Sequence, residues 1–148
     1  MGEQRTGDST RMIEVIYYSL TGNTKQVADA IAAELGVDAE NVKTKDMLAE
    51  DSLVFLGAGL YGPLRGLGFR RFIDRNDFAG RRVALFGTSG EGKGKEVGAL
   101  EEAVTAKGAE VAGSFFCRGE FMFLVNRRRP TSNDLENAAA FAREMAGD

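Results

Sequence analysis

The sequence predicts an α/β fold, a doubly wound three-layer α/β/α sandwich with a five-stranded parallel sheet of order 2-1-3-4-5. Apolar runs alternate with segments of helical periodicity in the order β-α-β-α-β-α-β-α-β. That alternation implies right-handed crossovers with helices on both faces of the sheet. Glycine-bearing loops follow the first, third and fourth strands, and in this order they converge on a crevice at the carboxyl ends of strands one and three.

The first elements follow from composition and from Gly punctuation. Residues 12–18, rich in Ile, Val and Tyr, predict a buried strand. Apolar residues recur every fourth position over residues 24–35, which predicts a helix that ends at Gly36. Residues 37–44 predict a weaker strand near a sheet edge. Residues 45–52 are polar and irregular, with one helical turn as an alternative.

The central and later elements are more strongly patterned. Residues 53–58 are apolar throughout, residues 82–88 are mainly apolar, and both predict buried strands. Residues 66–75 predict a short helix between these two strands. Residues 95–107 place apolar side chains on one helical face, and residues 110–117 predict the last strand.

The chain after the last strand predicts a long loop and a final helix. The loop spans residues 118–130, and the helix spans residues 133–145 behind a cap at Thr131 or Ser132. Cys117 ends the last strand, so we expect it to be a core residue rather than a redox thiol.

The composition of the chain excludes several classes of site and partner. The 148 residues predict one domain over residues 12–148, and the polar residues 1–11 predict a disordered N-terminal extension. With no His and a single Cys, neither a zinc site nor Ser-His-Asp or Cys-His catalysis is expected, so redox chemistry would need a cofactor. The net charge of −3 predicts no nucleic-acid partner. We expect a cytoplasmic protein without a membrane span, because no secretory signal or long apolar run is present.

The segment Ser19-Leu20-Thr21-Gly22-Asn23-Thr24 joins the first strand to the first helix and predicts a phosphate site. Backbone N–H groups and hydroxyls at a helix N-terminus attract an anion, and Gly22 lets the backbone turn. No Walker lysine and no G-x-G-x-x-G pattern occurs here, which favours a terminal phosphate monoester. An ordinary helix N-cap by Thr or Asn is the alternative.

This segment resembles the FMN-phosphate loop of the flavodoxin family, [ST]-x-T-G-N-T after the first strand. The resemblance covers roughly residues 12–146, and flavodoxin is itself a known example of the predicted strand order. It implies that Ser19, Thr21, Asn23 and Thr24 hold the FMN phosphate through side chains, while Leu20 and Gly22 use backbone N–H groups.

The resemblance also implies two loops around the flavin ring. The first includes Leu60, Tyr61, Gly62 and Pro63, in which Tyr61 would stack on the ring and the Gly62 carbonyl would accept a hydrogen bond from N5 of the reduced flavin. Tyr61 could instead be a core aromatic at the strand end. The second loop comprises Thr88, Ser89, Gly90 and Glu91, and its backbone N–H groups would face the pyrimidine edge of the ring.

Two features depart from the family. The second ring loop lacks the usual stacking aromatic, which Phe121 or Phe123 could replace, unless both pack at the core edge. Basic residues also occur in or near the expected site, where acidic residues are usual; they are Arg65, Lys93, Lys95, Arg127, Arg128 and Arg129. We therefore expect a less negative potential for the second reduction step than in acidic members of the family.

The expected function is that of an electron carrier that binds FMN noncovalently and exchanges electrons with a reductase and an acceptor. The resemblance implies no catalytic side chain and no metal, because the flavin would supply the chemistry. One alternative is an FMN-dependent NAD(P)H:quinone-type oxidoreductase, and another is a non-redox binding module on the same fold. The expected oligomeric state is a monomer or a weak dimer.

Overall fold

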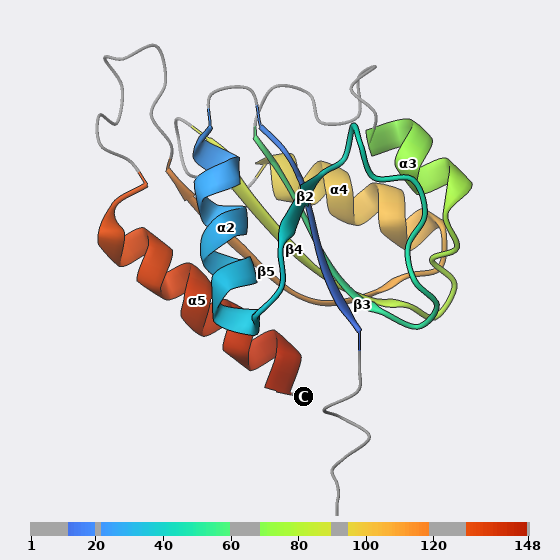
Figure 1. Ribbon diagram of the computed structural model, residues 1–148. Coiled ribbons are helices and arrows are strands. Elements are labelled where there is room, and N and C mark those ends of the chain that lie inside the picture. Colours follow the sequence, from blue (N-terminus) through green and yellow to red (C-terminus); the bar gives the residue numbers. More distant parts are fainter. Residues whose placement is uncertain (1–11, 20–21, 60–68, 90–94, 119–129, 148) are drawn as a thin grey trace, which may run out of the picture.

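The computed structural model describes residues 12–19, 22–59, 69–89, 95–118 and 130–147 (Figure 1). These residues form a parallel five-stranded sheet of order β2-β1-β3-β4-β5, which confirms the predicted fold class and strand order. The strands are β1 (Ile13–Tyr18), β2 (Ala39–Asn41), β3 (Leu53–Gly59), β4 (Arg82–Ser89) and β5 (Glu110–Arg118). The helices are α2 (Asn23–Leu35), α3 (Phe69–Arg75), α4 (Lys95–Ala106) and α5 (Ser132–Gly147).

The four described helices form two layers, with α2 and α5 on one face of the sheet and α3 and α4 on the other (Figure 1). Because side chains alternate along a strand, β3 contributes to both layers. Val54 and Leu56 join the cluster under α3 and α4, whereas Leu53 and Phe55 join the cluster under α2 and α5. A central strand buried on both faces explains why residues 53–58 read as continuously apolar.

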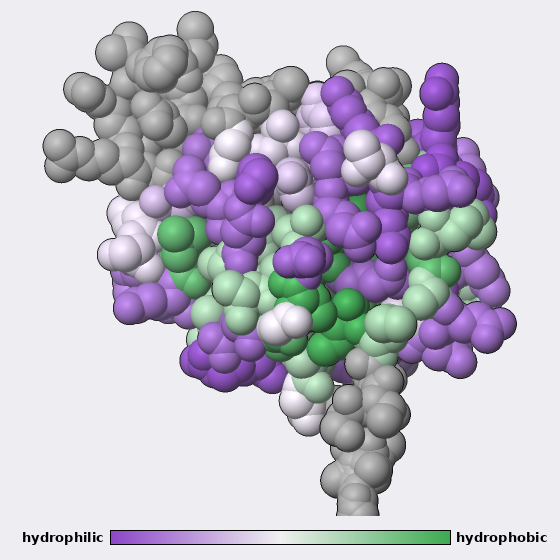
Figure 2. Space-filling view, in the orientation of Figure 1, coloured by the Kyte–Doolittle hydropathy of each residue, from purple (hydrophilic) through white to green (hydrophobic). Residues whose placement is uncertain are grey.

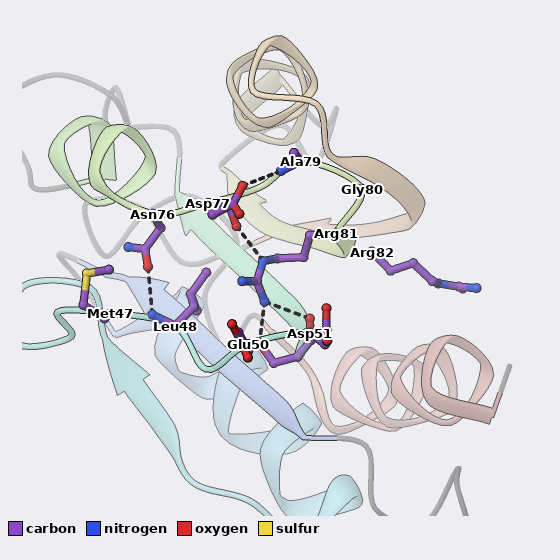
Figure 3. A pocket seen from close by; sticks show the side chains of 11 residues that line it. Met47, Leu48, Glu50, Asp51, Asn76, Asp77, Ala79, Gly80, Arg81 and Arg82 are labelled. Carbon is purple, nitrogen blue, oxygen red and sulfur yellow. Dashed lines mark hydrogen bonds between the residues drawn. The ribbon is translucent and has the colours of Figure 1, made fainter.

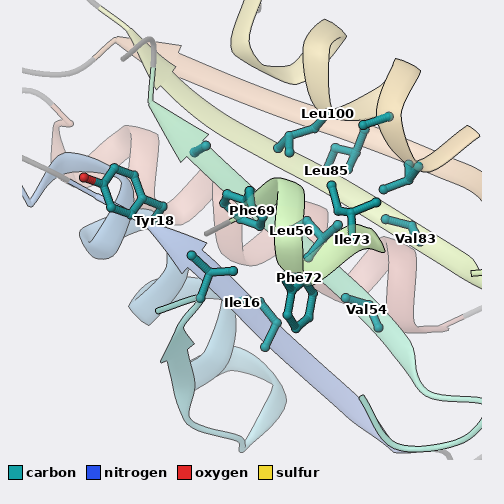
Figure 4. Packing of buried hydrophobic residues seen from close by; sticks show 14 of the residues in the cluster. Ile16, Tyr18, Val54, Leu56, Phe69, Phe72, Ile73, Val83, Leu85 and Leu100 are labelled. Carbon is teal, nitrogen blue, oxygen red and sulfur yellow. The ribbon is translucent and has the colours of Figure 1, made fainter. Parts of the chain in front are cut away.

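The layer under α3 and α4 is closely packed (Figure 4). Phe72 and Ile73 of α3 are fully buried against Leu56 of β3, and Leu85 and Leu100 join them from β4 and α4. Each such side chain contributes about 1.5–3 kcal/mol through removal from water. This packing explains why a helix of seven residues is stable here.

Aromatic contacts organise the opposite layer. Phe141 of α5 meets Phe55 of β3 edge to face, with ring centroids 6.0 Å apart, and lies 5.8 Å from Phe115 of β5. Cys117 is buried in the same cluster, as expected for a core residue at the end of its strand. Thr131 caps α5, because its Oγ1 accepts a hydrogen bond from the backbone N–H of Asp134 at 3.1 Å.

One local prediction differs from the structure, because the edge strand β2 spans only three residues. Residues 45–49 are irregular, as predicted, and the alternative of one helical turn is wrong. Side chains from distant elements bind the backbone of the irregular segment instead: Asn76 accepts from the N–H of Leu48, and Glu14 accepts from the N–H of Ala49. These bonds replace the local bonds that a helical turn would have made.

Candidate functional site

The candidate site lies at the edge of the sheet where β1, β3 and β4 end. In Figure 1, α2 begins at this edge beside the ends of these strands. The structure describes six of the predicted site residues, and for the last of them only the backbone: Ser19, Gly22, Asn23, Thr24, Thr88 and Ser89. The other predicted positions lie outside the described residues: Leu20, Thr21, Leu60, Tyr61, Gly62, Pro63, Gly90 and Glu91.

The start of α2 is shaped by Gly22 and Ser19. Gly22 is the N-cap residue, with φ of 93°, a left-handed conformation that favours glycine. Its N–H donates a hydrogen bond of 2.9 Å to Oγ of Ser19. No side-chain hydrogen bond from the N-cap position satisfies the helix, so the alternative of a Thr or Asn N-cap is wrong.

The first turn of α2 is suited to an anion. Asn23 and Thr24 are its first two residues, and both are buried. The first turn contains no acidic residue, and the helix dipole places partial positive charge at this end. Hydroxyl, amide and backbone donors at a helix N-terminus fit a phosphate monoester.

A hydrogen bond joins this first turn to the end of β4. Oγ1 of Thr24 and Oγ1 of Thr88 lie 2.7 Å apart, and either hydroxyl can be the donor. The two side chains are 1% and 3% exposed, so water does not compete for this bond. Two residues that are 64 positions apart, both predicted from sequence to contact one cofactor, are therefore in direct contact.

The face of β4 that carries Thr88 explains this contact. Ala84 and Phe86 point into the layer of α2 and α5, and Thr88 continues the same alternation two residues later. Its hydroxyl therefore points towards α2. The sequence already contained this signal, because the spacing from Phe86 fixes the face, but the partner in α2 was not foreseen.

Other predicted residues around the ring lie outside the described residues or lack described side chains. The described part of the chain does not include Arg65, Lys93, Phe121, Phe123, Arg127, Arg128 and Arg129. Lys95 begins α4, and only its backbone is described. The expected influence of these cations on the potential therefore stays a prediction.

A polar network occupies the opposite edge of the sheet, where the strands begin. The Glu14 carboxylate accepts hydrogen bonds from Oγ of Ser52 at 2.7 Å and the N–H of Ala49 at 2.9 Å, and Nζ of Lys45 lies 2.7 Å away. Burial alone would raise the pKa of Glu14. The hydrogen bonds and the charge of Lys45 outweigh it and lower the pKa below its ordinary value.

A pocket of about 590 Å³ opens beside this network (Figure 3). Arg81 occupies its middle: its guanidinium donates to the carbonyls of Ala49, Ser52 and Asp77. These bonds hold the irregular segment against the sheet. The pocket lies where β3 and β4 begin, whereas α2 starts at the opposite edge, and Arg81 has a structural role in the pocket.

The surface beside β2 is partly apolar. Hydrophobic side chains gather in the lower middle of the face in Figure 2, where a second hollow of about 580 Å³ is lined by Met12, Val37 and Met47 among others. Met12 and Met47 are more than half exposed. This hollow also lies at the edge where the strands begin, away from the candidate site.

Neither a metal centre nor a membrane helix is found in the part of the chain that the structure describes. No three His, Cys, Asp or Glu residues within it are grouped so as to hold a metal ion. None of its helices is long and apolar enough to cross a membrane.

The geometry agrees with comparisons to known proteins. The family model of the flavodoxin domain matches residues 14–145. The chain belongs to the flavodoxin family. It is 32% identical over 110 residues to a flavodoxin of Clostridium beijerinckii, covering 67% of this chain and 80% of that relative. It is 32% identical over 116 residues to a flavodoxin of Megasphaera elsdenii, covering 70% and 83%.

A solved structure shows the same fold. Oxidised flavodoxin 2 from Bacillus cereus superposes with a TM-score of 0.68 over 92% of this chain and 98% of that chain, at 23% identity. Flavodoxins are FMN-binding electron-transfer proteins, and FMN is therefore the cofactor of this chain. The donor set at the start of α2 fits its phosphate.

Proposed function

We propose that this flavodoxin carries electrons between two redox proteins, a reductase and an acceptor, in the cytoplasm. The observation that carries the proposal is the 2.7 Å contact between Thr24 and Thr88. It joins the start of α2, which suits a phosphate, to the end of β4, from which a predicted ring loop departs. Both contacts to the cofactor would thus be fixed by one rigid part of the fold.

The proposal gives the chain's residues binding roles. Ser19, Asn23 and Thr24 would donate to the FMN phosphate, and Gly22 would allow the backbone to approach it. Ser89 would begin the loop at the pyrimidine edge. Leu20 and Thr21 at the phosphate, and Leu60, Tyr61, Gly62, Pro63, Gly90 and Glu91 at the ring, are proposed from the family resemblance alone.

No side chain is proposed to act as an acid or base. FMN supplies the redox chemistry when it is bound, and the protein sets its orientation and its access to partners. We further propose that residues 12–148 form a single domain that acts as a monomer or a weak dimer.

The test is anaerobic reduction of the FMN-loaded protein, with the flavin absorption as the readout. As a carrier, the protein is reduced slowly by NADPH alone and rapidly when a flavodoxin reductase is added. Rapid reduction by NADPH without a partner protein would contradict the carrier and favour the NAD(P)H-dependent oxidoreductase. A purified protein that does not bind FMN would contradict the proposed function itself.

A further inference from the structure

Thr88 lies near the end of β4, which leads to a predicted ring loop. Its hydroxyl contacts the hydroxyl of Thr24 in α2. We propose that Thr88 is a positioning residue for the FMN phosphate. In this role it donates its hydroxyl hydrogen to Thr24, so that the hydroxyl hydrogen of Thr24 is directed at the phosphate. This inference rests on the proposed function and deepens it, since it assigns Thr88 to the phosphate end of the cofactor.

The placement of Thr88 supports this assignment. Its register partners are Gly59 of β3 and Cys117 of β5, so its backbone is held between two neighbouring strands. Its side chain faces the layer of α2 and α5, and its hydroxyl lies 2.7 Å from that of Thr24. This contact places the Thr88 hydroxyl where it can donate to Thr24.

Hydroxyl chemistry determines the direction of the bond. Each threonine hydroxyl has one hydrogen to donate and lone pairs that accept, and a single hydrogen lies between two oxygens at this distance. In the absence of an anion, the two donor directions are both available. A phosphate dianion only accepts, so Thr24 must donate to it, and Thr88 must then donate to Thr24.

The chain of donors Thr88, Thr24 and phosphate is stronger than its separate links. Each hydrogen bond polarises the next in a buried site, and a hydrogen bond to a charged acceptor is stronger than one between neutral groups. Because both threonines are almost completely buried, solvent cannot supply the hydrogen that Thr88 gives to Thr24. Removal of the Thr88 hydroxyl should therefore weaken phosphate binding through Thr24.

The first test compares FMN with riboflavin, which has the same ring and no phosphate. Thr88→Val keeps the side-chain shape and removes the hydroxyl, whereas Thr88→Ser keeps the hydroxyl. We expect Thr88→Val to raise the dissociation constant of FMN about fivefold to tenfold and that of riboflavin less than twofold. Thr88→Ser should recover most of the FMN affinity. Thr105→Val, an exposed change in α4, controls for the substitution type.

The riboflavin result separates the two roles of Thr88. Equal weakening of FMN and riboflavin would overturn the proposal in favour of a contact to the ring. Unchanged binding of both would overturn it in favour of simple packing. Thermal unfolding of each apo-variant checks that the fold is retained. Thr88→Ala, which also removes the hydroxyl, carries the test against Thr88→Ser if Thr88→Val does not fold.

The second test is a double-mutant cycle with Thr24→Val. If Thr88 acts through Thr24, the loss from Thr88→Val should disappear when Thr24 has no hydroxyl. Additive losses would show that Thr88 contacts the cofactor independently of Thr24, and they would contradict the proposal.

A third measurement needs no flavin. Inorganic phosphate is titrated into the apo-protein, and the amide shifts of residues 22–25 are followed by NMR. The wild type and Thr88→Ser should bind phosphate more tightly than Thr88→Val. An unchanged phosphate dissociation constant in Thr88→Val contradicts this inference, whereas failure of the wild type to bind FMN contradicts the proposed function.

Discussion

At the centre of the sheet, the packing between β3 and β4 requires a residue without a side chain at position 57. Gly57 of β3 lies opposite Phe86 of β4 in the register, and a Cβ atom on Gly57 would overlap the Phe86 ring. Phe86 is fully buried in the layer of α2 and α5, so its ring cannot move into solvent. Gly57 therefore provides the space for an aromatic side chain on the neighbouring strand.

This close approach predicts that Gly57→Ala destabilises the protein. The added methyl group must displace a buried ring, which typically costs about 1–3 kcal/mol of unfolding free energy. Gly98→Ala is the matched control, because Gly98 is exposed in α4 and an added Cβ meets no atom within 4 Å. The control should gain about 0.5–1 kcal/mol from helix propensity. Urea unfolding measures both, and similar values for the two variants would refute the packing argument.

Glu14 gives a second residue-level prediction, with a defined pH dependence. Its folded pKa lies below the ordinary 4.5, so its ionised form stabilises the fold above that pH. This stabilisation is lost as the pH falls through the folded pKa. Glu14→Gln should lower the unfolding free energy by about 1–3 kcal/mol at pH 7, because Lys45 loses its nearest carboxylate.

The measurement is urea unfolding at several pH values from 7 down through the acid range. The difference between wild type and Glu14→Gln should shrink as the pH falls from 4.5 through the lower folded pKa of Glu14. Glu34→Gln serves as a control, since Glu34 pairs with Arg143 at the surface, and its effect should stay within about 0.5 kcal/mol. A constant difference for Glu14→Gln at all pH values would disprove the role of its charge.

At the scale of elements, the helix α2 is bounded at both ends by a glycine in the left-handed conformation. Gly22 begins the helix at the edge where the strands end, with φ of 93°, and Gly36 ends it at the opposite edge, with φ of 72°. Neither position has an atom within 4 Å of an added Cβ. Substitution at either site therefore strains the backbone without a steric clash.

This pair of glycines predicts separable effects on stability and binding. Gly22→Ala and Gly36→Ala should each cost about 1–2 kcal/mol, the price of a left-handed conformation for a residue with a Cβ. Only Gly22→Ala should also weaken FMN binding, because it alters the turn between Ser19 and α2. Urea unfolding and FMN titration of both variants test this. Equal affinities for FMN in the two variants would contradict a role for Gly22 in the site.

The elements that could be predicted from sequence are those whose own residues determine them. The strand at residues 53–58 was predicted because it is apolar on both faces, and α5 because Thr131 caps an amphipathic segment. The three-residue β2 was overestimated, because its length depends on pairing with β1 alone. Residues 45–52 were predicted to be irregular, but their path was not predictable, because it depends on bonds from distant Glu14 and Arg81.

The predicted site likewise combines a local pattern with a distant contact. The expected phosphate loop has a local sequence pattern, which predicted roles for Ser19, Gly22, Asn23 and Thr24 at or just before the start of α2. The contact between Thr24 and Thr88 has no local pattern, since it requires the crossover that places β4 beneath α2. The sequence therefore predicted both residues for the site but not their bond to each other.

At the scale of the whole molecule, the amino ends and the carboxyl ends of the strands differ in their contacts. The edge where the strands begin is fixed by the contacts of Glu14, Lys45 and Arg81 without any ligand. These contacts join β1 to the irregular segment that precedes β3. The edge where the strands end carries the start of α2, with Asn23 and Thr24 that are predicted to bind the phosphate.

This arrangement predicts that FMN stabilises the entire fold. Thr24 and Thr88 are 64 residues apart, so the unfolded chain cannot hold them together and should not bind the phosphate. Ligand that binds only the folded state adds about 2.7 kcal/mol to the unfolding free energy at a free concentration one hundred times its dissociation constant. Thermal unfolding over a series of FMN concentrations should show a midpoint that rises with the logarithm of concentration. At equal concentration riboflavin should shift the midpoint less, because it lacks the phosphate, and Gly36→Ala should retain the full response to FMN from a lower starting value. A midpoint independent of FMN would show that the folded and unfolded chains bind it equally or not at all, and that the donors at the start of α2 do not form a cofactor site.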